Sequence, residues 1–357
     1  MTTWPDRRAL ELFGIDVPIL LAPMAGFGTA PLAIAAASAG ALGAIACATL
    51  TIDDADRAVA SFRECRRPIN VNFFCHAPPT GDDVAWRARL APYYAELAAT
   101  PSPSAGAQRR PFDADVCAWV ERVRPEVVSF HFGLPAAELV ARVKAIGARV
   151  ISSATTVREA RWLEAHGCDA IIAQGAEAGG HRAMFLTDDV ASQVGTFALV
   201  PQIADAVRVP VIAAGGIGDA RGIAAAFALG ASAVQLGTAY LACPEANVSA
   251  IHRAALAAAS DDSTMITNVL TGRPARGIAN RAIVELGPVS RDVAPFPLAS
   301  AALAPLRAKA EARGTGDFTN LWAGQAAPLA HAGEPALQLT QRLARETLAV
   351  FQRLDVL

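Results

Sequence analysis

The glycine-rich stretch AQGAEAGGHR, residues 173–182, carries a histidine, His181, directly after an apolar run. A second histidine, His131, lies at the end of the run VVSFHF. An imidazole has an unperturbed pKa of about 6.5, so it is suited to take or give a proton near neutral pH. Catalytic groups of strand–helix proteins lie where strands end, and both histidines stand at such points. We therefore expect His181 to be catalytic and His131 to face the same site. The remaining histidines are expected to be ordinary polar residues (His76, His166, His252 and His331).

Two carboxamides stand in or at the end of apolar runs: Asn72 in INVNFF and Gln174 in AIIAQ. A buried amide needs hydrogen-bond partners, which either the backbone or the edge of a planar cofactor ring would supply. The stretch APMAG, residues 22–26, adds a small, soft surface on which a flat ring could lie. Met24 taken alone is better explained as a core residue.

Two glycine-rich loops, in AAGGIGDARG and VQLGTAYL, each lead from an apolar run into a helical pattern. Such loops present backbone N–H groups to a phosphate, and the candidates are Gly215, Gly216, Gly237 and Thr238. A tight turn needs glycine in any case, but two neighbouring loops of this kind favour phosphate binding. With the two amides they describe a pocket for a phosphorylated planar heterocycle. Flavin mononucleotide (FMN) is the economical candidate.

Eight short apolar runs recur along the chain, at 18–23, 42–46, 69–74, 127–132, 149–154, 170–174, 210–216 and 233–238. Continuous rather than alternating hydrophobicity is typical of strands buried on both faces of a parallel sheet. Helical patterns follow most of them, with a capping box at Thr156 and Glu159 and a cap at Asp219. No GxGxxG follows the first run. The pattern predicts an α/β fold, a (β/α)₈ barrel rather than an open doubly wound sheet.

Two regions depart from the repeat. Residues 76–114 form an insertion near the barrel mouth, expected to contain one or two helices and a Pro/Ser-rich loop. Residues 246–314 lack a strong strand signal, so we expect a smaller, mainly helical cap there. The barrel is then residues 1–245, and residues 315–357 pack back on it through an amphipathic C-terminal helix.

Composition excludes several classes of protein. The formal net charge of −2 gives no field to gather nucleic acid. Six scattered cysteines indicate neither a disulfide framework nor a metal site. The N-terminus lacks the order of a signal peptide, so a cytoplasmic location is expected. The uncharged stretch 27–50 is broken by Gly40 and Gly43, which favours a helix at 31–39 and a strand at 42–46 over a membrane span.

Several motifs together resemble the nitronate monooxygenases, formerly called 2-nitropropane dioxygenases: PILLAPMAG, INVNFF, SFHFGLP, AQGAEAGGHR, PVIAAGGIGDARGIAAAFALGASAVQLGTAYL and DFTNLWAGQAA. The similarity runs from Pro18 to Gln325. It implies an FMN-dependent TIM barrel that oxidises alkyl nitronates with O₂ to a carbonyl compound and nitrite, through a flavin semiquinone and without a pyridine nucleotide. The expected partners are small molecules, and the protein is expected to be a monomer or homodimer.

The resemblance also implies roles for individual residues. His181 matches a catalytic histidine and His131 a histidine on the substrate side. Phe296 stands where similar proteins often have a tyrosine, which favours a more apolar substrate. Positions that match contacts to FMN are Pro23, Met24, Gly26, Asn72, Gln174, Gly179, Gly216, Gln235, Leu236, Gly237 and Thr238.

Two alternatives remain open at this point. The flavin-dependent NAD(P)H enoyl-acyl carrier protein reductases resemble the chain around GGHR and the phosphate loops. The other alternative is a flavin-binding barrel without catalytic activity. Arg273, Arg276 and Arg281 form either a solvated face of the cap or a site for a substrate carboxylate.

Overall fold

The computed structural model describes residues 3–101 and 111–354. Its main sheet has eight parallel strands in the order β1-β9-β8-β6-β5-β4-β3-β2. The two edges meet at Leu42, whose N–H donates to the Ile19 carbonyl at 3.0 Å and whose carbonyl accepts from the Leu21 N–H at 3.0 Å. These bonds bring the first strand beside the second, so the sheet closes into a barrel.

All eight predicted strands are confirmed within two residues at each end. They are β1 (Ile19–Leu21), β2 (Gly43–Ala46), β3 (Ile69–Phe74), β4 (Val127–His131), β5 (Arg149–Ala154), β6 (Ala170–Gln174), β8 (Val211–Ala214) and β9 (Ala233–Leu236). Their side chains are buried almost throughout, as expected of strands covered on one face by helices and filled on the other by the barrel core.

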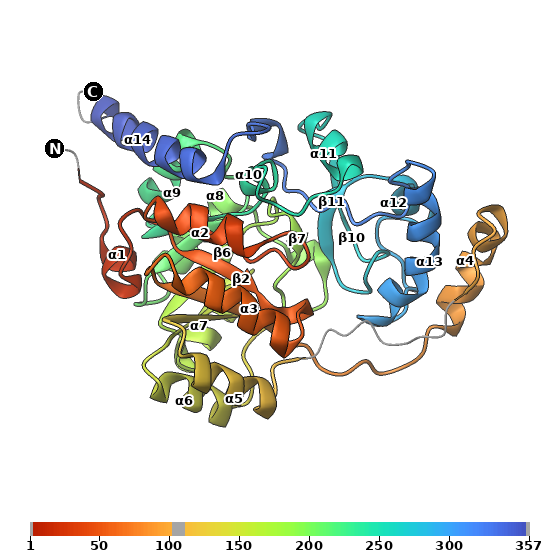
Figure 1. Ribbon diagram of the computed structural model, residues 1–357, viewed down its shortest axis with the longest axis horizontal. Coiled ribbons are helices and arrows are strands. Elements are labelled where there is room, and N and C mark those ends of the chain that lie inside the picture. Colours follow the sequence, from red (N-terminus) through yellow and green to blue (C-terminus); the bar gives the residue numbers. More distant parts are fainter. Residues whose placement is uncertain (1–2, 102–110, 355–357) are drawn as a thin grey trace.

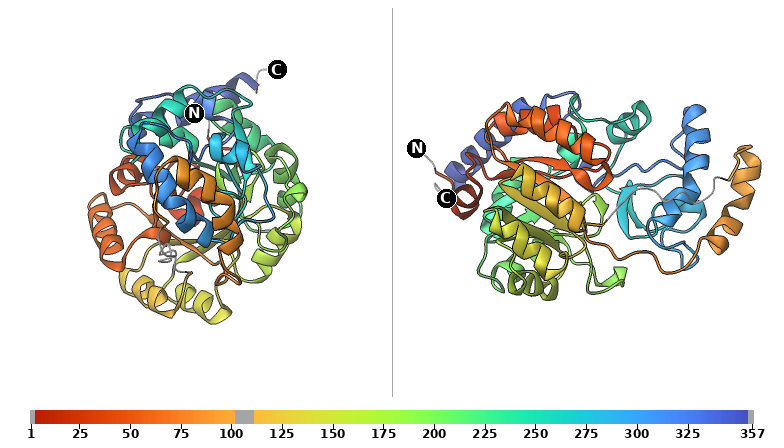
Figure 2. Two further views of the ribbon diagram at one scale, coloured as in Figure 1. Left: turned by 90° about the vertical axis from the view of Figure 1, so that its right-hand side faces the viewer. Right: turned by 60° about the horizontal axis from the view of Figure 1, so that its bottom comes forward.

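Helices surround the barrel (Figure 2). They are α1 (Arg8–Phe13), α2 (Ala30–Ser38), α3 (Ile52–Arg63), α5 (Ala114–Val123), α6 (Ala137–Ala145), α7 (Val157–Ala165), α8 (Thr196–Ala204), α9 (Ala220–Ala228), α10 (Thr238–Leu241) and α14 (Ala336–Leu354). No helix in the described ranges is long and apolar enough to cross a membrane. The uncharged stretch that raised this question is α2 followed by β2, as expected.

The predicted caps are present, with one difference. The Asp219 carboxylate accepts from the Arg221 and Gly222 N–H groups at the start of α9. The Thr156 hydroxyl accepts from the Glu159 N–H, as in a capping box. The Glu159 carboxylate does not return to Thr156, however. It accepts from Thr155 and from the distant N–H groups of Phe185 and Leu186, so it links the start of α7 to a loop instead.

A smaller unit lies beside the barrel and contains α4 (Val84–Glu96), α12 (Arg281–Glu285) and α13 (Leu298–Ala312) (Figure 1). The helix α11 (Ala250–Ala257) instead packs on the barrel core through Leu256. The smaller unit has its own apolar core, in which Trp86 and Leu90 of α4 join Leu303 of α13 and Phe318. The insertion between β3 and β4 therefore contributes α4 to this core; its residues 102–110 lie outside the described part. We propose that α4 and the cap form one domain.

The cap also contains two strands that the sequence analysis did not expect, β10 (Thr264–Thr267) and β11 (Ala275–Ile278). The strand β10 pairs with β11, and β11 pairs with β7 (Gly180–His181), in an antiparallel sheet of order β10-β11-β7. TMIT and ARGI are short and not strongly apolar, so their strand conformation depends on pairing rather than on local preference. This sheet joins the cap to the segment that carries His181.

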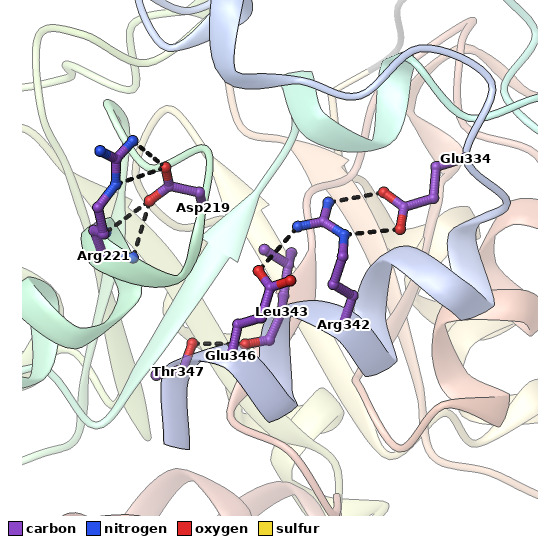
Figure 3. Close-up of polar contacts among 8 residues, drawn as sticks. Asp219, Arg221, Glu334, Arg342, Leu343, Glu346 and Thr347 are labelled. Carbon is purple, nitrogen blue, oxygen red and sulfur yellow. Dashed lines mark hydrogen bonds and ion pairs between the residues drawn. The ribbon is translucent and has the colours of Figure 1, made fainter. Parts of the chain in front are cut away.

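The C-terminal helix α14 packs on α9 and α2, as expected of its amphipathic pattern. Leu339 and Leu343 are buried on its inner side. Near its start, Arg342 donates to both carboxylate oxygens of Glu334 at 2.8 Å and to Glu346 at 3.1 Å (Figure 3). The apolar face provides most of the attachment, because partly exposed ion pairs contribute little.

This packing predicts that Leu343→Ala lowers the free energy of unfolding by about 2–4 kcal/mol, because it leaves a cavity under α14. Urea denaturation of the purified protein measures the change. Leu354→Ala, at a position on the same helix that is 58% exposed, is the matched control and should change stability by less than about 0.5 kcal/mol. Equal effects of the two substitutions would contradict the assignment of the buried face.

Candidate active site

A cavity opens at the carboxyl ends of the barrel strands, and most of the predicted site residues line it. They are Pro23, Met24, Asn72, His131, Gln174, Gly179, His181, Gly215, Gly216, Gln235, Gly237 and Thr238. Other lining residues were not expected, among them Glu177, Ser129 and Trp322. The residues come from nearly every strand end, which is where (β/α)₈ enzymes carry their active sites.

Three predicted residues do not line the cavity. Leu236 is buried in the barrel wall, because its neighbour Gln235 on β9 faces the cavity and successive residues of a strand face opposite ways. Gly26 lies in the turn after Met24, with a φ of +85° that favours glycine. Phe296 belongs to an apolar cluster with Phe74 and Phe132 beside His181.

His181 lies on β7, which pairs with β11 of the cap so that Ala275 is opposite His181. On the barrel side, the His181 carbonyl accepts from Gln174 Nε2 at 3.0 Å and from His131 Nε2 at 3.1 Å. The main chain of His181 is therefore held by both parts of the molecule. This strand was not predicted, since two residues are too few to give a periodic pattern.

The hydrogen bonds also assign protons to the two rings. A carbonyl only accepts, so His131 carries its proton on Nε2. His181 Nε2 lies 3.0 Å from the Thr271 hydroxyl, which itself donates to the Arg273 carbonyl. The hydroxyl therefore accepts from His181 Nε2, which leaves the lone pair of the neutral ring on Nδ1. Burial lowers the pKa of His131 to about 4, so this ring is neutral at physiological pH.

Aromatic rings surround His181. The ring centroids of Phe296, Trp322, Phe132 and Phe74 lie 5.5, 5.6, 5.8 and 6.2 Å from that of His181. The Trp322 carbonyl accepts from Nε2 of His252, a buried residue of α11 that the sequence analysis took for an ordinary polar one. The surroundings of His181 are thus largely apolar on the side of the cap.

The opposite part of the cavity is built from glycines and amides. Gly179 and Gly215 leave no room for a side chain, since a Cβ atom would lie 2.5 Å from the Gly324 nitrogen or 2.9 Å from the Ala178 nitrogen. The N–H groups of Gly216 and Ile217 donate to no acceptor within residues 3–101 and 111–354. Gln235 Oε1 is buried and also has no partner there. These groups can bind a ligand with phosphate and ring N–H groups.

The two other amides already have partners in the protein. Asn72 Nδ2 donates to the carbonyl and hydroxyl oxygens of Ser129 at 3.2 and 3.0 Å. Gln174 uses both ends of its amide, since Oε1 accepts from the Ala183 N–H at 2.8 Å. Glu177 accepts from the N–H and hydroxyl of Thr196 and so caps α8 from the cavity rim. No motif pointed to Glu177, because its partner is 19 residues away.

The three arginines of TGRPARGIANR do not form a single solvated face. Arg281 is ion-paired with Glu96 of α4 and with Glu285. Arg276 is buried and donates to the Ala176 carbonyl and to Thr264. Arg273 donates to the Met184 carbonyl, and its guanidinium lies 4.1 Å from the ring centre of Phe132. Each arginine thus holds one part of the cap in place.

The described residues contain no group of side chains that could bind a metal ion.

Comparisons with known proteins identify the family of the chain. A family model described as nitronate monooxygenase matches residues 7–346. A nitronate monooxygenase from Paraburkholderia phytofirmans is 43% identical, over 97% of this chain and 96% of that protein.

Two solved structures also match nearly the whole chain. Nitroalkane oxidase from Streptomyces ansochromogenes has a TM-score of 0.89 at 36% identity, over 97% of this chain and 99% of that one. FabK from Thermotoga maritima has a TM-score of 0.76 at 30% identity, over 99% of both chains. The matches extend over nearly the whole chain, barrel and cap included. The chain therefore belongs to the nitronate monooxygenase family, a family of flavin-dependent oxidoreductases.

Proposed function

We propose that the protein binds FMN and oxidises alkyl nitronates with O₂ to a carbonyl compound and nitrite. The observation that carries the proposal is the position of His181, held between barrel and cap at the wall of a cavity. The other wall has glycine loops and an amide oxygen, Gln235 Oε1, without a partner among the described residues. Small molecules are its expected partners. We also propose a cytoplasmic location and a monomer or homodimer.

The residues at the barrel end of the cavity fit FMN. The N–H groups of Gly216 and Ile217 suit the phosphate, as do those of the loop at Gly237 and Thr238. Gln235 Oε1 needs a donor, and the N–H group in the flavin ring system is one. Asn72 and Met24 also line this part. Gln174, by contrast, has both ends of its amide engaged by the protein, so we assign it to holding His181.

When bound, FMN would take electrons from the nitronate and pass them to O₂. His181 would act on the substrate itself. In its protonated form it would hydrogen-bond the nitro oxygens of a nitronate, and in its neutral form Nδ1 would accept a proton from the α-carbon of a nitroalkane. Thr271 orients the ring through Nε2 in both cases.

The aromatic surroundings favour substrates with apolar alkyl groups. Phe74, Phe132, Phe296 and Trp322 present carbon surfaces around His181, and Phe296 has no hydroxyl group. Exclusion of water by these rings would strengthen the hydrogen bonds between His181 and the nitro group.

The central experiment measures the visible spectrum of the purified protein and then nitrite release from an alkyl nitronate without a second charged group, such as propane-2-nitronate, under air. We expect a yellow protein with FMN and nitrite release without added nicotinamide cofactor. A protein that releases no nitrite, but whose flavin is rapidly reduced by NADPH in the absence of O₂, would contradict the proposal and favour the enoyl reductase alternative.

Replacing His181 with Asn should lower nitrite release from neutral nitroalkanes by roughly 10²- to 10⁴-fold, because the proton acceptor is lost. Oxidation of preformed nitronate should fall less, and the flavin content should not change. His166→Asn is the matched control, since His166 is exposed at the end of α7. Steady-state kinetics with both substrate forms decides: equal turnover by wild type and His181→Asn would rule out the assigned role.

His131 predicts a dependence of stability on pH. Its pKa is about 4 in the folded protein and about 6.5 when unfolded, so between these values the unfolded chain binds more protons. The free energy of unfolding should therefore fall as the pH drops from 6.5 to 4, by at most about 1.4 kcal/mol per pH unit from this residue. His131→Gln should reduce that slope, and urea denaturation at several pH values measures it. An unchanged slope would show that His131 is not buried in its neutral form.

A further inference from the structure

The residue after His181, Arg182, is a fully buried guanidinium without an ion pair to any carboxylate of the described ranges. Its Nε donates to Gln193 Oε1 at 2.8 Å and its Nη2 to the Gln174 carbonyl at 2.7 Å, and both acceptors are neutral. Its Nη1 is buried without a partner there. An unpaired buried charge is costly, so a residue without a task at this position would be expected to be apolar. The mechanism above gives Arg182 no role.

Hydrogen bonds run in both directions between Gln174 and the segment around Arg182. The Gln174 amide donates to the His181 carbonyl and accepts from the Ala183 N–H, on either side of Arg182. The Arg182 guanidinium in turn donates to the Gln174 carbonyl at the end of β6. We call this arrangement the Gln174–Arg182 clamp. It fixes the main chain before and after Arg182 relative to a barrel strand, and so restricts the position of His181.

The clamp is anchored at further points. The Arg182 N–H donates to the Pro274 carbonyl of the cap at 2.8 Å. Gln193, which binds the guanidinium, donates to the Thr155 hydroxyl at the end of β5. That hydroxyl donates to the buried Glu159, whose other carboxylate oxygen accepts from Phe185 and Leu186. Arg182 is therefore linked directly to β6 through its side chain and to the cap through its main chain, and through Gln193 to the end of β5 and the loop after His181.

We propose that Arg182 is a positioning residue, which together with Gln174 sets the imidazole of His181 against the substrate and affects the reaction only through His181. The proposal rests on the catalytic role of His181 proposed above. This role explains why a long side chain with several donors stands here. An apolar residue could not donate to one main-chain acceptor, the Gln174 carbonyl, and one side-chain acceptor, Gln193 Oε1.

The test combines two substitutions. Arg182→Met is made in the wild type and in His181→Asn, and nitrite release from a neutral nitroalkane, bound FMN and the dissociation constant of FMN are measured for each. In the wild type, Arg182→Met should lower kcat roughly 10- to 100-fold, because a misplacement of about 1 Å costs this much. Bound FMN should stay within twofold. In the His181→Asn background the same substitution should cause no further loss.

Arg253→Met is the matched control. The Arg253 guanidinium also donates to two neutral acceptors, here the main-chain carbonyls of Cys243 and Ala246, but it lies on α11. This variant should keep the wild-type kcat. Arg182→Lys retains the charge and one donor toward Gln174, so its kcat should lie between those of Arg182→Met and the wild type. If Arg182→Met does not fold, Arg182→Lys takes its place in the same comparison.

Two results would overturn the proposal. A further loss in the His181→Asn background as large as that in the wild type would show that Arg182 acts independently of His181. A wild-type kcat in a folded Arg182 variant would show that it does not act at all. A wild type without nitrite release, or a fully active His181→Asn, is a different outcome, which removes the proposed function and the positioning role together.

Discussion

The short strand Gly180–His181 depends on both parts of the molecule, and the candidate site depends on this strand. On one side it pairs with β11 of the cap, and on the other its carbonyl accepts hydrogen bonds from Gln174 and His131 of the barrel. Gly180 has a φ of +73°, a conformation that only glycine adopts without strain. Two residues form no stable strand in isolation, so the position of His181 is a property of the assembled fold.

This arrangement divides the cavity into two chemically different walls. The barrel wall is made of glycine loops and amides, in which groups such as Gln235 Oε1 have no partner in the described part of the chain. The wall toward the cap is aromatic, and His181 is the polar group at its centre. A phosphorylated heterocycle suits the first wall, and a small alkyl nitronate suits the second. The antiparallel sheet that carries His181 lies where the two walls meet.

The barrel was predictable from the sequence because its strands are continuous apolar runs, and each such run was found as a strand. The glycines, amides and histidines at the strand ends were predictable for the same reason: the topology brings strand ends together. Leu236 was assigned to the site from the resemblance alone, and the alternation along β9 turns it away.

What could not be predicted depends on contacts between distant segments. The strands β10 and β11 have little apolar character, and α4 joins the cap from an insertion nearly 200 residues earlier in the chain. His252 was predicted only as an ordinary polar residue, yet it is buried and its Nε2 donates to the Trp322 carbonyl. The Thr156–Glu159 motif was found as a helix cap, yet its carboxylate serves a tertiary contact to Phe185 and Leu186. A motif gives the residue types, and only the fold gives their partners.

The central claim is that a nitronate bound against His181 reduces the flavin directly. Mixing the FMN-loaded protein with propane-2-nitronate in the absence of O₂ tests it, with the visible absorbance of the flavin as the readout. We expect the absorbance of the oxidised flavin to be replaced rapidly by that of the one-electron-reduced flavin without any nicotinamide cofactor, and to recover when O₂ is admitted. A flavin that stays oxidised with the nitronate but bleaches at once with NADPH would contradict it.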